Sequence, residues 1–379
     1  MVENINVALI GCGMIADAHA KLISNIPNAR VIAVCDSEPL MAAQLADRYN
    51  IPNHFPNFKK LHQTCRPDVV HILTPPSTHF PLGMEALEAG CHVLLEKPFT
   101  VNAVEAKTLL DTAAILGKKI IVNHFHNFSP PSLRLRKMIK QGRIGTVLHM
   151  DGYYGYSVKS PVAKALFEDK HSWIHRLPGT VLQNNIDHLI GKFTEYIPDP
   201  EPTVWVHAKK LSREVKRIAH SEIYDELRVM LAGRTVTAYA TFSSNIQPFQ
   251  HYMIVFGTKG SVIVDYESRS IVTVPVSGLP GPFGKLAAPF ITGRKYISEG
   301  VKNVIAFAKS DFHFYAGASR LFQDFYRCVR DNAPPPLDYD YMMKTVTTLD
   351  NIFARISENP DVTPGPPKPI LEEEVAMQS

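Results

Sequence analysis

The sequence predicts a two-domain α/β protein whose first domain is a doubly wound parallel sheet, and three observations carry this prediction. The chain has 379 residues, more than one hydrophobic core usually organises. From residue 5 to residue 124, strand-like apolar runs alternate with helix-like stretches, which is typical of a parallel sheet with right-handed crossovers. Beyond residue 124, strand-like runs follow one another with fewer helices between them. This second pattern predicts an α+β domain with a mostly antiparallel sheet.

The alternation fixes the order of the elements expected in the first domain, which we place at residues 1–124. Its strands are expected at residues 5–10, 30–35, 68–74, 91–95 and 119–123. Its helices are expected at about 14–25, 39–49, 80–89 and 103–116. The strand runs are β-branched and apolar, as strands buried on both faces of a sheet must be.

The second domain, placed at residues 125–358, is predicted to combine helices with a larger sheet. Its strands are expected at residues 147–156, 203–211, 221–232, 235–242, 250–257 and 260–265. Its helices are expected at about 131–141, 181–196, 297–309, 316–331 and 340–357. Residues 275–295 are rich in Pro and Gly, which predicts a long, mobile loop. The last residues, 359–379, are predicted to be a disordered tail.

The balance of charges and the cysteine pattern exclude several classes of protein. The chain carries 40 basic and 36 acidic residues, a net charge of +4, which predicts neither a nucleic-acid nor a membrane partner. No apolar run is long enough to span a bilayer, and the N-terminus does not have the pattern of a signal peptide. The five cysteines show no Cys-x-x-Cys spacing. We therefore expect reduced packing residues in a cytoplasmic protein, and no metal site.

A glycine-rich turn joins the first predicted strand to the first predicted helix. The run Gly11-Cys12-Gly13-Met14-Ile15-Ala16 has the G-x-G-x-x-A spacing of dinucleotide-binding loops, in the strand-to-helix setting that this spacing requires. The first glycine permits the tight turn, and the second lets the backbone approach a pyrophosphate. The helix N-terminus adds free N–H groups and a positive dipole end. The residues expected to contact a dinucleotide here are Gly11, Gly13, Met14, Ile15 and Ala16.

An aspartate stands where a dinucleotide ribose is usually bound. Asp36 follows strand 30–35 and lies 23 residues beyond Gly13. A carboxylate at this place accepts hydrogen bonds from both ribose hydroxyls and repels a 2′-phosphate, so NAD is favoured over NADP. A second role, as the N-cap of the following helix, is compatible with the first.

Polar residues also follow the next three strands, at the same edge of the predicted sheet. In a parallel sheet the carboxyl ends of the strands open onto the ligand crevice, so these residues are expected to line the cofactor site. The expected cofactor contacts in these loops are Thr74, Pro75, Pro76, His79, Glu96, Lys97 and Asn123, of which the two prolines hold the shape of their loop. A surface ion pair is the alternative for Glu96 and Lys97. The recurrence of polar residues at successive strand ends favours the ligand site.

In this order, the motifs Gly11-x-Gly13-x-x-Ala16, Asp36, Thr74-Pro75-Pro76-x-x-His79 and Glu96-Lys97-Pro98 resemble one family. It is the glucose-fructose oxidoreductase / inositol dehydrogenase / rhizopine catabolism (Gfo/Idh/MocA) family of NAD(P)-dependent oxidoreductases. The resemblance covers residues 5 to about 355. It implies a Rossmann NAD-binding domain, a small-molecule carbohydrate substrate, and a homodimer or homotetramer formed through one face of the second sheet. One departure is Asn127, which stands where the family often has an arginine.

The resemblance also implies a proton-transfer residue on helix 181–196. The family's usual histidine follows an aspartate or asparagine by four positions, which selects His188 after Asn184. The two share one helical face. Asn184 is expected to hold the imidazole by a hydrogen bond, and a purely structural histidine is the alternative. Asp187 is expected either to bind substrate or to support the fold.

Further substrate contacts are expected from residues near this helix. Tyr153 lies in strand 147–156, and His171 and Trp173 lie just ahead of the helix. An aromatic side chain among hydrogen-bonding groups suits a sugar ring, although Trp173 has the alternative role of anchoring its loop to the core. Arg134, Arg136, Lys137 and Lys140, on helix 131–141, are expected on a solvated face, with phosphate binding as the alternative. The full set of expected substrate contacts is Lys97, Tyr153, His171, Trp173, Asn184, Asp187 and His188.

The residues and the resemblance together predict an NAD-dependent oxidoreductase that acts on a secondary alcohol of a sugar, polyol or sugar nucleotide. His188 is expected to take the hydroxyl proton as the hydride leaves, and Lys97 to polarise the same oxygen. Glu96 is expected to position Lys97 or to close the cofactor pocket. Two alternatives stay open: an NAD-retaining glycoside hydrolase that acts by transient oxidation, and a non-enzymatic NAD-binding regulator.

Overall fold

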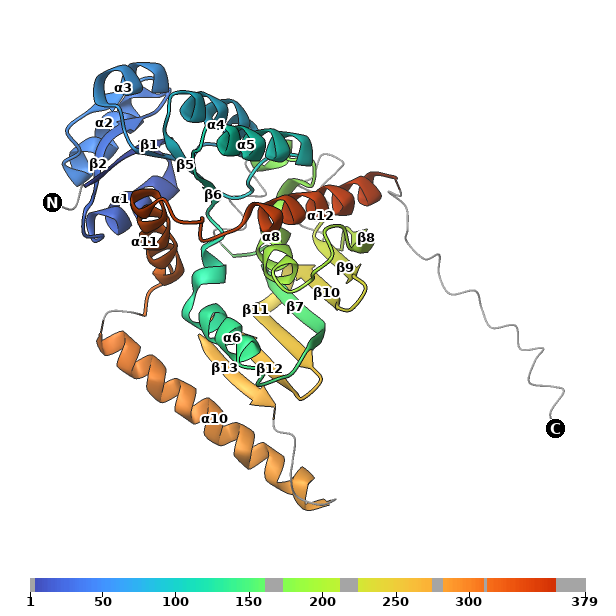
Figure 1. The fold of residues 1–379 in the computed structure, drawn as a ribbon. Coiled ribbons are helices and arrows are strands. Elements are labelled where there is room, and N and C mark those ends of the chain that lie inside the picture. Colours follow the sequence, from blue (N-terminus) through green and yellow to red (C-terminus); the bar gives the residue numbers. More distant parts are fainter. Residues whose placement is uncertain (1–3, 161–172, 212–223, 275–281, 310–311, 359–379) are drawn as a thin grey trace.

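The computed structural model describes residues 4–160, 173–211, 224–274, 282–309 and 312–358. Within these residues the chain forms two sheets, and helices near the C-terminus pack against both (Figure 1). The tail predicted at 359–379 lies outside the described residues.

The first sheet is parallel and has the strand order β3-β2-β1-β4-β5-β6. Its strands are β1 (Ile5–Ile10), β2 (Ala29–Cys35), β3 (His54–Phe55), β4 (Val69–Ile72), β5 (His92–Leu95) and β6 (Ile120–Val122). The helices between them are α1 (Met14–Ser24), α2 (Pro39–Tyr49), α3 (Phe58–Cys65), α4 (His79–Glu88) and α5 (Ala103–Ile115), with the short 3₁₀ turn η1 (Pro76–Thr78) ahead of α4. This order confirms the predicted doubly wound fold. It also places the loops after β1 and β4 side by side at the point where the strand order reverses.

The second sheet has the order β13-β12-β11-β7-β10-β9-β8. Its strands are β7 (Val147–Ser157), β8 (Thr203–Lys209), β9 (Glu226–Ala232), β10 (Thr237–Ser243), β11 (Asn245–Gly257), β12 (Gly260–Asp265) and β13 (Ser270–Val274). All neighbours are antiparallel except β7 and β10, which are parallel. The predicted mostly antiparallel sheet is therefore confirmed, with β13 added.

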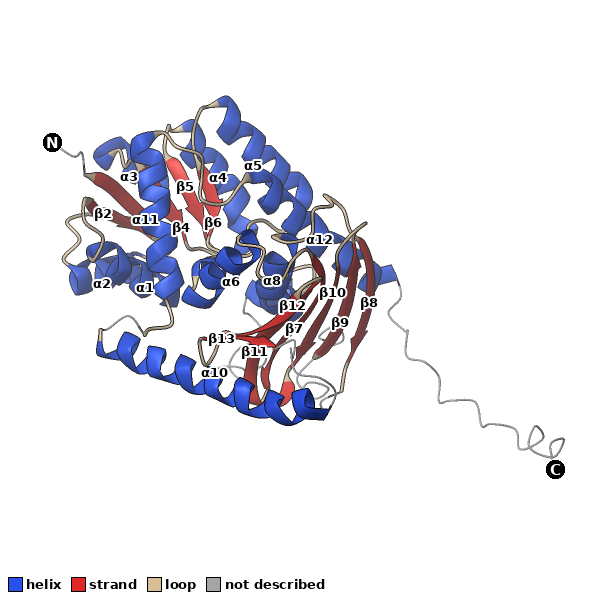
Figure 2. Ribbon diagram, turned by 60° about the horizontal axis from the view of Figure 1, so that its bottom comes forward, coloured by secondary structure: helices blue, strands red, loops and turns tan. Residues whose placement is uncertain are grey.

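One face of the second sheet is covered and the other is open. The covering helices are α6 (Pro130–Lys140) and α8 (Thr180–Thr194) (Figure 2). The 3₁₀ turn η2 (Phe125–Phe128) contacts both helices, and η3 (Trp173–Arg176) contacts α8. Gly152 of β7 lies against Phe193 of α8 so closely that an added Cβ would approach the ring to 2.5 Å. On the open face the side chains of Trp205 and Tyr239 are about half exposed.

The last two helices return to the first domain. Phe322 and Phe325 of α11 (Ala316–Asp331) are fully buried in the core of the first sheet, and Met342 of α12 (Tyr339–Glu358) joins them. Figure 1 shows α11 close to α1, and α12 passing between the two domains. The domain boundaries at residues 124 and 358 stay a prediction, and this packing adds that α11 belongs to the first core.

One prediction for the second domain is wrong. Residues 282–295 were expected in a mobile loop, yet they form the first half of α10 (Pro282–Ala308). Pro289 lies inside this helix, where it lacks the N–H that would donate to residue 285. The apolar residues spaced three and four apart, among them Phe283, Leu286 and Phe290, have a helical period that the Pro and Gly content masked.

Among the residues that the structure describes, no helix is both long and apolar enough to cross a membrane.

The contact between α11 and η2 gives a stability prediction. At Gly317 an added Cβ would come within 2.1 Å of the Phe125 carbonyl oxygen, and main chain cannot rotate away as a side chain can. Gly317→Ala should therefore lower the free energy of unfolding by about 1–3 kcal/mol, the usual cost of overpacking. Urea titration measures this, with Gly260→Ala as the control because nothing lies within 4 Å of its Cβ position. Equal stability of the two variants would contradict the packing.

Candidate active site

Lys97 joins the two domains at the carboxyl edge of the first sheet. It lies two residues beyond the end of β5, ahead of a cis Lys97-Pro98 bond, and it is half-buried. Its Nζ donates to the side-chain oxygen of Asn184 at 2.8 Å and to the backbone oxygen of the same residue at 3.1 Å. Burial lowers the pKa of Lys97, while Asp187 and Glu96 oppose that shift. The predicted strand-end lysine therefore reaches the helix that carries the predicted histidine.

His188 lies one turn beyond Asn184 on α8 and is half-buried. Its ring centroid is 4.7 Å from that of His126 and 5.6 Å from that of Tyr154. Burial holds its pKa well below the usual value, and the cations nearby, Lys97 first among them, lower it further. A bond from Asn184 to this imidazole was expected. Among the described contacts, Asn184 is instead bonded to Lys97.

Two buried basic residues behind His188 were missed by sequence reasoning. Lys192 donates to the backbone oxygen of His188 at 2.8 Å and to Nε2 of His251 at 3.1 Å. Its ammonium also lies 4.5 Å from the ring centroid of Tyr266, and burial lowers its pKa to about 7. The sequence did contain a signal for Lys192, because it follows His188 by four residues and therefore lies on the same face of the helix.

His251 comes from the second sheet, and a third missed residue, His126, comes from η2. His251 of β11 is paired in register with Tyr154 of β7, and their ring centroids are 4.9 Å apart. His126 lies in η2, and its pKa is held well below the usual value by burial and by Lys192. The pairing of β7 with β11 places His251 next to Tyr154, and the contact of η2 with α8 brings His126 to His188, so no local pattern predicted them.

Glu96 is held in place by a buried chain of hydrogen bonds within the first domain. Its Oε1 lies 2.9 Å from Nε2 of His19, and Nδ1 of His19 lies 2.8 Å from Nδ1 of His71. The chain ends at the hydroxyl of Tyr326 on α11, 2.9 Å from Nε2 of His71. The other carboxylate oxygen accepts from the backbone N–H of Lys97 at 3.2 Å. Of the two expected roles of Glu96, this geometry favours positioning Lys97.

Asn123, just beyond β6, has one satisfied and one unsatisfied side-chain atom. Its Nδ2 donates to Glu96 Oε1 at 2.5 Å. Its Oδ1 is buried and has no hydrogen-bond partner among the described residues. A buried acceptor on a side chain bonded to Glu96 is suited to a ligand donor such as a carboxamide.

The glycine loop leaves room for a phosphate group. Gly11 has φ +92°, and an added Cβ would lie 2.9 Å from the backbone N of Thr74, so only glycine fits there. At Gly13 nothing lies within 4 Å of the Cβ position. Met14 is almost fully exposed at the start of α1, Ile15 is half-buried, and Ala16 is fully buried against the sheet. These positions fit the roles predicted for a dinucleotide loop.

Asp36 follows β2 and organises the neighbouring turns. Its Oδ2 accepts from the N–H of Cys12 at 2.7 Å, and its Oδ1 accepts from the N–H of Glu38 at 2.9 Å. The N-cap of α2 is Glu38, so Asp36 binds the N-cap residue and is not the cap itself. Its carboxylate lies against the glycine loop, where a ribose contact is expected.

The loop after β4 is held from behind by His79. Thr74 and Pro75 are half-buried, whereas Pro76 is buried. The His79 ring is fully buried, with Nε2 at 2.8 Å from the Thr74 oxygen and Nδ1 at 3.0 Å from the Pro98 oxygen. The geometry therefore gives His79 the task of tying two loops together, in place of the cofactor contact that was expected.

The expected substrate contacts are only partly brought together. Tyr153 is on the open face of the second sheet, opposite to Tyr154, and stacks on Tyr252 with centroids 5.6 Å apart. Side chains alternate between the two faces of β7, and Met150 and Gly152 are on the face that α8 covers, so Tyr153 was assigned to the wrong face. His171 lies outside the described residues.

Asp187 and Trp173 take the structural roles that were their alternatives. Asp187 is fully buried, and its carboxylate lies 3.1 Å from Nε2 of His124, whose Nδ1 lies 2.8 Å from the hydroxyl of Tyr341. It supports the join between α8 and α12. Trp173 packs against a small apolar cluster that contains Ile174 and so anchors its loop.

The basic face expected on α6 is neutralised. Arg134 donates two hydrogen bonds to Glu299 at 2.6 and 2.7 Å, and Arg136 donates to Glu195 at 2.6 and 3.0 Å. Asn127 donates to the Gly191 oxygen at 3.1 Å, so it holds α8. Both arginine side chains are still more than one-third exposed, so they lie on a solvated face as predicted, with their charges paired to carboxylates.

Among the described residues, no group of His, Cys, Asp and Glu side chains is arranged to hold a metal ion. The five cysteines are free. Burial raises the pKa of Cys12, Cys35 and Cys91 to about 12, which makes these thiols unreactive packing groups.

The parallel sheet, the glycine loop and the lysine that reaches α8 define the class: a two-domain protein with a Rossmann-type, dinucleotide-binding fold and a candidate site between its domains. Residues 5–124 match the sequence model of a family described as "Oxidoreductase family, NAD-binding Rossmann fold" (GFO_IDH_MocA). Levoglucosan dehydrogenase of Pseudarthrobacter phenanthrenivorans is 30% identical over 306 residues, 72% of this chain and 76% of that protein. The chain belongs to the Gfo/Idh/MocA oxidoreductase family.

Other relatives match over a shorter stretch. D-glucoside 3-dehydrogenase of Escherichia coli is 33% identical over 144 residues, 38% of this chain. The match spans 41% of the length of that relative.

Solved structures confirm the fold over nearly the whole chain. A levoglucosan dehydrogenase in complex with NADH and levoglucosan superposes with a TM-score of 0.76, covering 94% of this chain and 98% of that one, at 18% identity over this longer alignment. The WlbA dehydrogenase of Bordetella pertussis, in complex with NADH and UDP-GlcNAcA, gives a TM-score of 0.74 over 94% and 96% of the two chains, at 17% identity.

The cations around His188 give a prediction that needs no substrate. Its imidazole should titrate below the ordinary histidine pKa, because burial and positive neighbours disfavour the charged form. Lys192→Met removes one of those cations, so the pKa of His188 should rise towards its usual value. NMR titration of the imidazole measures this, with the His188→Ala spectrum assigning the signal. Lys302→Met, on α10, is the control. A pKa unchanged by Lys192→Met would contradict the arrangement.

Proposed function

We propose that the protein is an NAD-dependent dehydrogenase or reductase that transfers a hydride between a secondary alcohol of a sugar, polyol or sugar nucleotide and the nicotinamide. The observation that carries the proposal is the meeting of the two domains at Lys97. A lysine just beyond β5, at the same sheet edge as the glycine loop, is bonded to Asn184, one turn before His188 on the same helix face. Family membership and relatives named as carbohydrate dehydrogenases support it.

The residues around the glycine loop would hold the cofactor, which when bound accepts or supplies the hydride. Gly13 and the N-terminus of α1 would take the pyrophosphate, and Asp36 the ribose hydroxyls. Thr74 and Asn123 lie at the ends of β4 and β6, where the unsatisfied Oδ1 of Asn123 would accept from the carboxamide. NAD is favoured over NADP because Asp36 repels a 2′-phosphate.

Lys97 and His188 would share the reacting hydroxyl. An ammonium has three N–H donors, and two of those of Lys97 go to Asn184, so one is left for a substrate oxygen. Its lowered pKa makes it a better donor to an oxygen that gains negative charge. His188 stays neutral because its pKa is depressed, so it can accept the hydroxyl proton.

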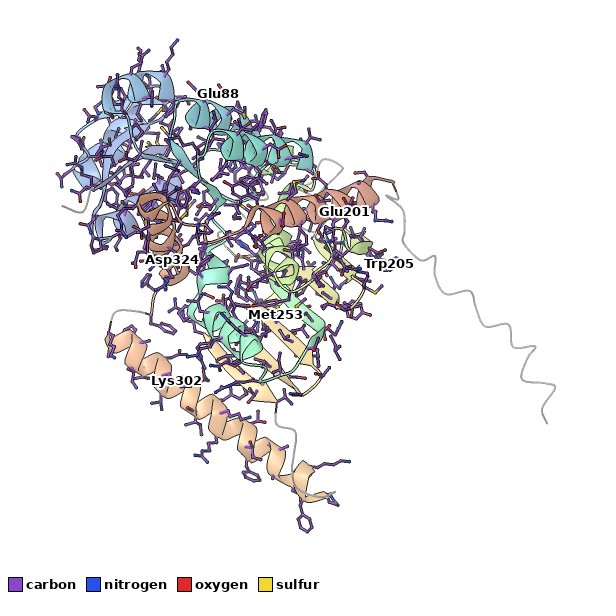
Figure 3. All side chains as sticks on the ribbon, in the orientation of Figure 1. Glu88, Glu201, Trp205, Met253, Lys302 and Asp324 are labelled. Carbon is purple, nitrogen blue, oxygen red and sulfur yellow. The ribbon has the colours of Figure 1, made fainter. Side chains whose placement is uncertain are left out.

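We also propose that copies of the chain associate through the open face of the second sheet, as a homodimer or homotetramer. A hollow of about 400 Å³ lies on that face, lined mainly by apolar and aromatic residues such as Trp205, Met230 and Tyr239. Figure 3 shows Trp205 at the outer side of the sheet. The five free thiols support a cytoplasmic location.

The two alternatives receive no support. The two relatives cited above are named as dehydrogenases, not as glycoside hydrolases or regulators.

Removal of either proposed acid–base group should slow turnover without unfolding the protein. Lys97→Ala and His188→Ala should each lower kcat by roughly 10²–10⁴, the range for loss of a positioned acid or base. The double variant should be little worse than the worse single one, because groups that act together are not additive. Steady-state oxidation of a carbohydrate found by screening with NAD measures this. Ser77→Ala is the control. Turnover by His188→Ala near the wild-type rate would refute the assignment.

The cofactor preference has its own test. Calorimetric titration of the wild type should show NAD binding more tightly than NADP, and Asp36→Ser with Ser37→Arg should shift the ratio towards NADP by roughly tenfold or more, about 1.4 kcal/mol. Serine keeps one acceptor for the turn that Asp36 holds, and the melting temperature checks that the turn survives. Equal or tighter binding of NADP by the wild type would contradict the role of Asp36.

A further inference from the structure

Helix α10 is amphipathic in the reverse sense: its polar face lies against its own subunit. Glu299 is only 4% exposed and is bonded to Arg134 at 2.6 Å. Lys295 donates to the backbone oxygen of Thr273 at 2.8 Å. A helix fixed to the domain by charged groups leaves its apolar residues on the side that faces away, and Figures 1 and 3 show α10 running along the rim of the second domain.

The outward side of α10 carries a regular seam of positions spaced alternately three and four residues apart. Its members are Phe283, Leu286, Phe290, Gly293, Ile297, Gly300, Val304 and Phe307. The six large side chains are each at least 67% exposed. A 3-4 repeat sustained over four heptads is the pattern of a helix that packs against another helix.

No contact within the described residues explains the two glycines of the seam. Gly293 and Gly300 are helical, and nothing lies within 4 Å of either Cβ position. Glycine weakens a helix relative to alanine, and here no contact of the described chain requires the missing side chain. Each glycine leaves a notch in the seam, and nothing in the described part of the chain fills either notch.

The seam is complementary to itself when it is reversed. About a two-fold axis through position 295, Phe283 faces Phe307 of a second copy and Leu286 faces Val304. Phe290 then faces Gly300, and Ile297 faces Gly293. Each of the two large residues nearest the axis is thus opposite a notch, as a close helix pair needs.

We propose that α10 is a self-association site, in which the helices of two copies of this chain pair antiparallel along this seam. A two-fold interface uses the same patch on both partners, and only an antiparallel register puts every notch opposite a bulky residue. The exposed apolar area, roughly 600–800 Å² per copy, is close to the ~800 Å² that each partner contributes to a standard interface. It exceeds the largest apolar patch of most monomers.

The seam is separate from the sheet face on which Trp205 lies. Arg294 flanks the seam near the axis and stays at the solvent-exposed rim, where salt screens its charge. A membrane surface is the other occupant for an apolar helix, but a flat bilayer gives no reason for two notches matched to Phe290 and Ile297.

Cross-linking tests the register. Chains with Leu286→Cys and with Val304→Cys, each in a Cys65→Ser background and with a different affinity tag, are expressed together and oxidised. The pairing predicts a disulfide between the two differently tagged chains, and little between chains of one kind, whose cysteines lie far apart. Equal cross-linking within one kind, or none at all, would overturn the antiparallel register.

Light scattering and sedimentation test the notches. Gly300→Leu adds apolar surface and helix propensity, so non-specific hydrophobic association would become stronger. In the proposed pairing the leucine fills the space that Phe290 of the second copy needs, so the dissociation constant should rise roughly 10–100-fold. Ser298→Leu, exposed on α10 outside the seam, is the matched control and should leave association unchanged. Trp205→Glu should leave the disulfide formed. A wild-type chain that is monomeric, or that sediments with phosphatidylglycerol vesicles instead, would refute the proposal.

Discussion

The hydrogen bond between the Lys97 ammonium and Asn184 is the contact on which the rest of the site depends. It joins the carboxyl edge of one sheet to a helix that covers the other, and it is the point where residues 87 positions apart become one site. Behind it, the chain from Glu96 through His19 and His71 reaches α11. The C-terminal part of the chain thus fixes the strand-end lysine from within the first core.

The second physical theme is the way the site keeps its histidine neutral. Burial is the main cause that lowers the pKa of His188. The ammonium groups of Lys97 and Lys192 and the nearby imidazoles of His126 and His251 lower it further. Asp187, which is near in sequence, is turned away and paired with His124. The proposed base is therefore kept neutral first by burial and then by repulsion from basic neighbours, in contrast to the carboxylate–histidine pairs that raise a histidine pKa.

The sequence was sufficient where a function depends on local geometry. The strand–Gly11–Gly13–helix unit and the lysine at the end of β5 lie where they were predicted, because strand order and the edge of a parallel sheet follow from βα alternation. His251 and Tyr154 were beyond sequence reasoning, because only the register of two strands brings them to α8.

The errors have physical causes as well. Tyr153 was assigned to the wrong face of its strand, since neighbouring tyrosines hid the period of two. His79 looked like a ligand contact because it follows two prolines, yet burial between two carbonyl oxygens makes it a brace. In α10, Pro and Gly were taken as loop formers, and their place in a 3-4 repeat was overlooked.

The proposed reaction requires Lys97 and His188 to contact the same substrate oxygen. A crystal structure of the protein with NAD and a bound carbohydrate measures this directly. We expect one hydroxyl to lie about 3 Å from both Lys97 Nζ and a ring nitrogen of His188, with the Lys97–Asn184 bond kept. A hydroxyl bonded to neither side chain, with both still turned to protein partners, would contradict it.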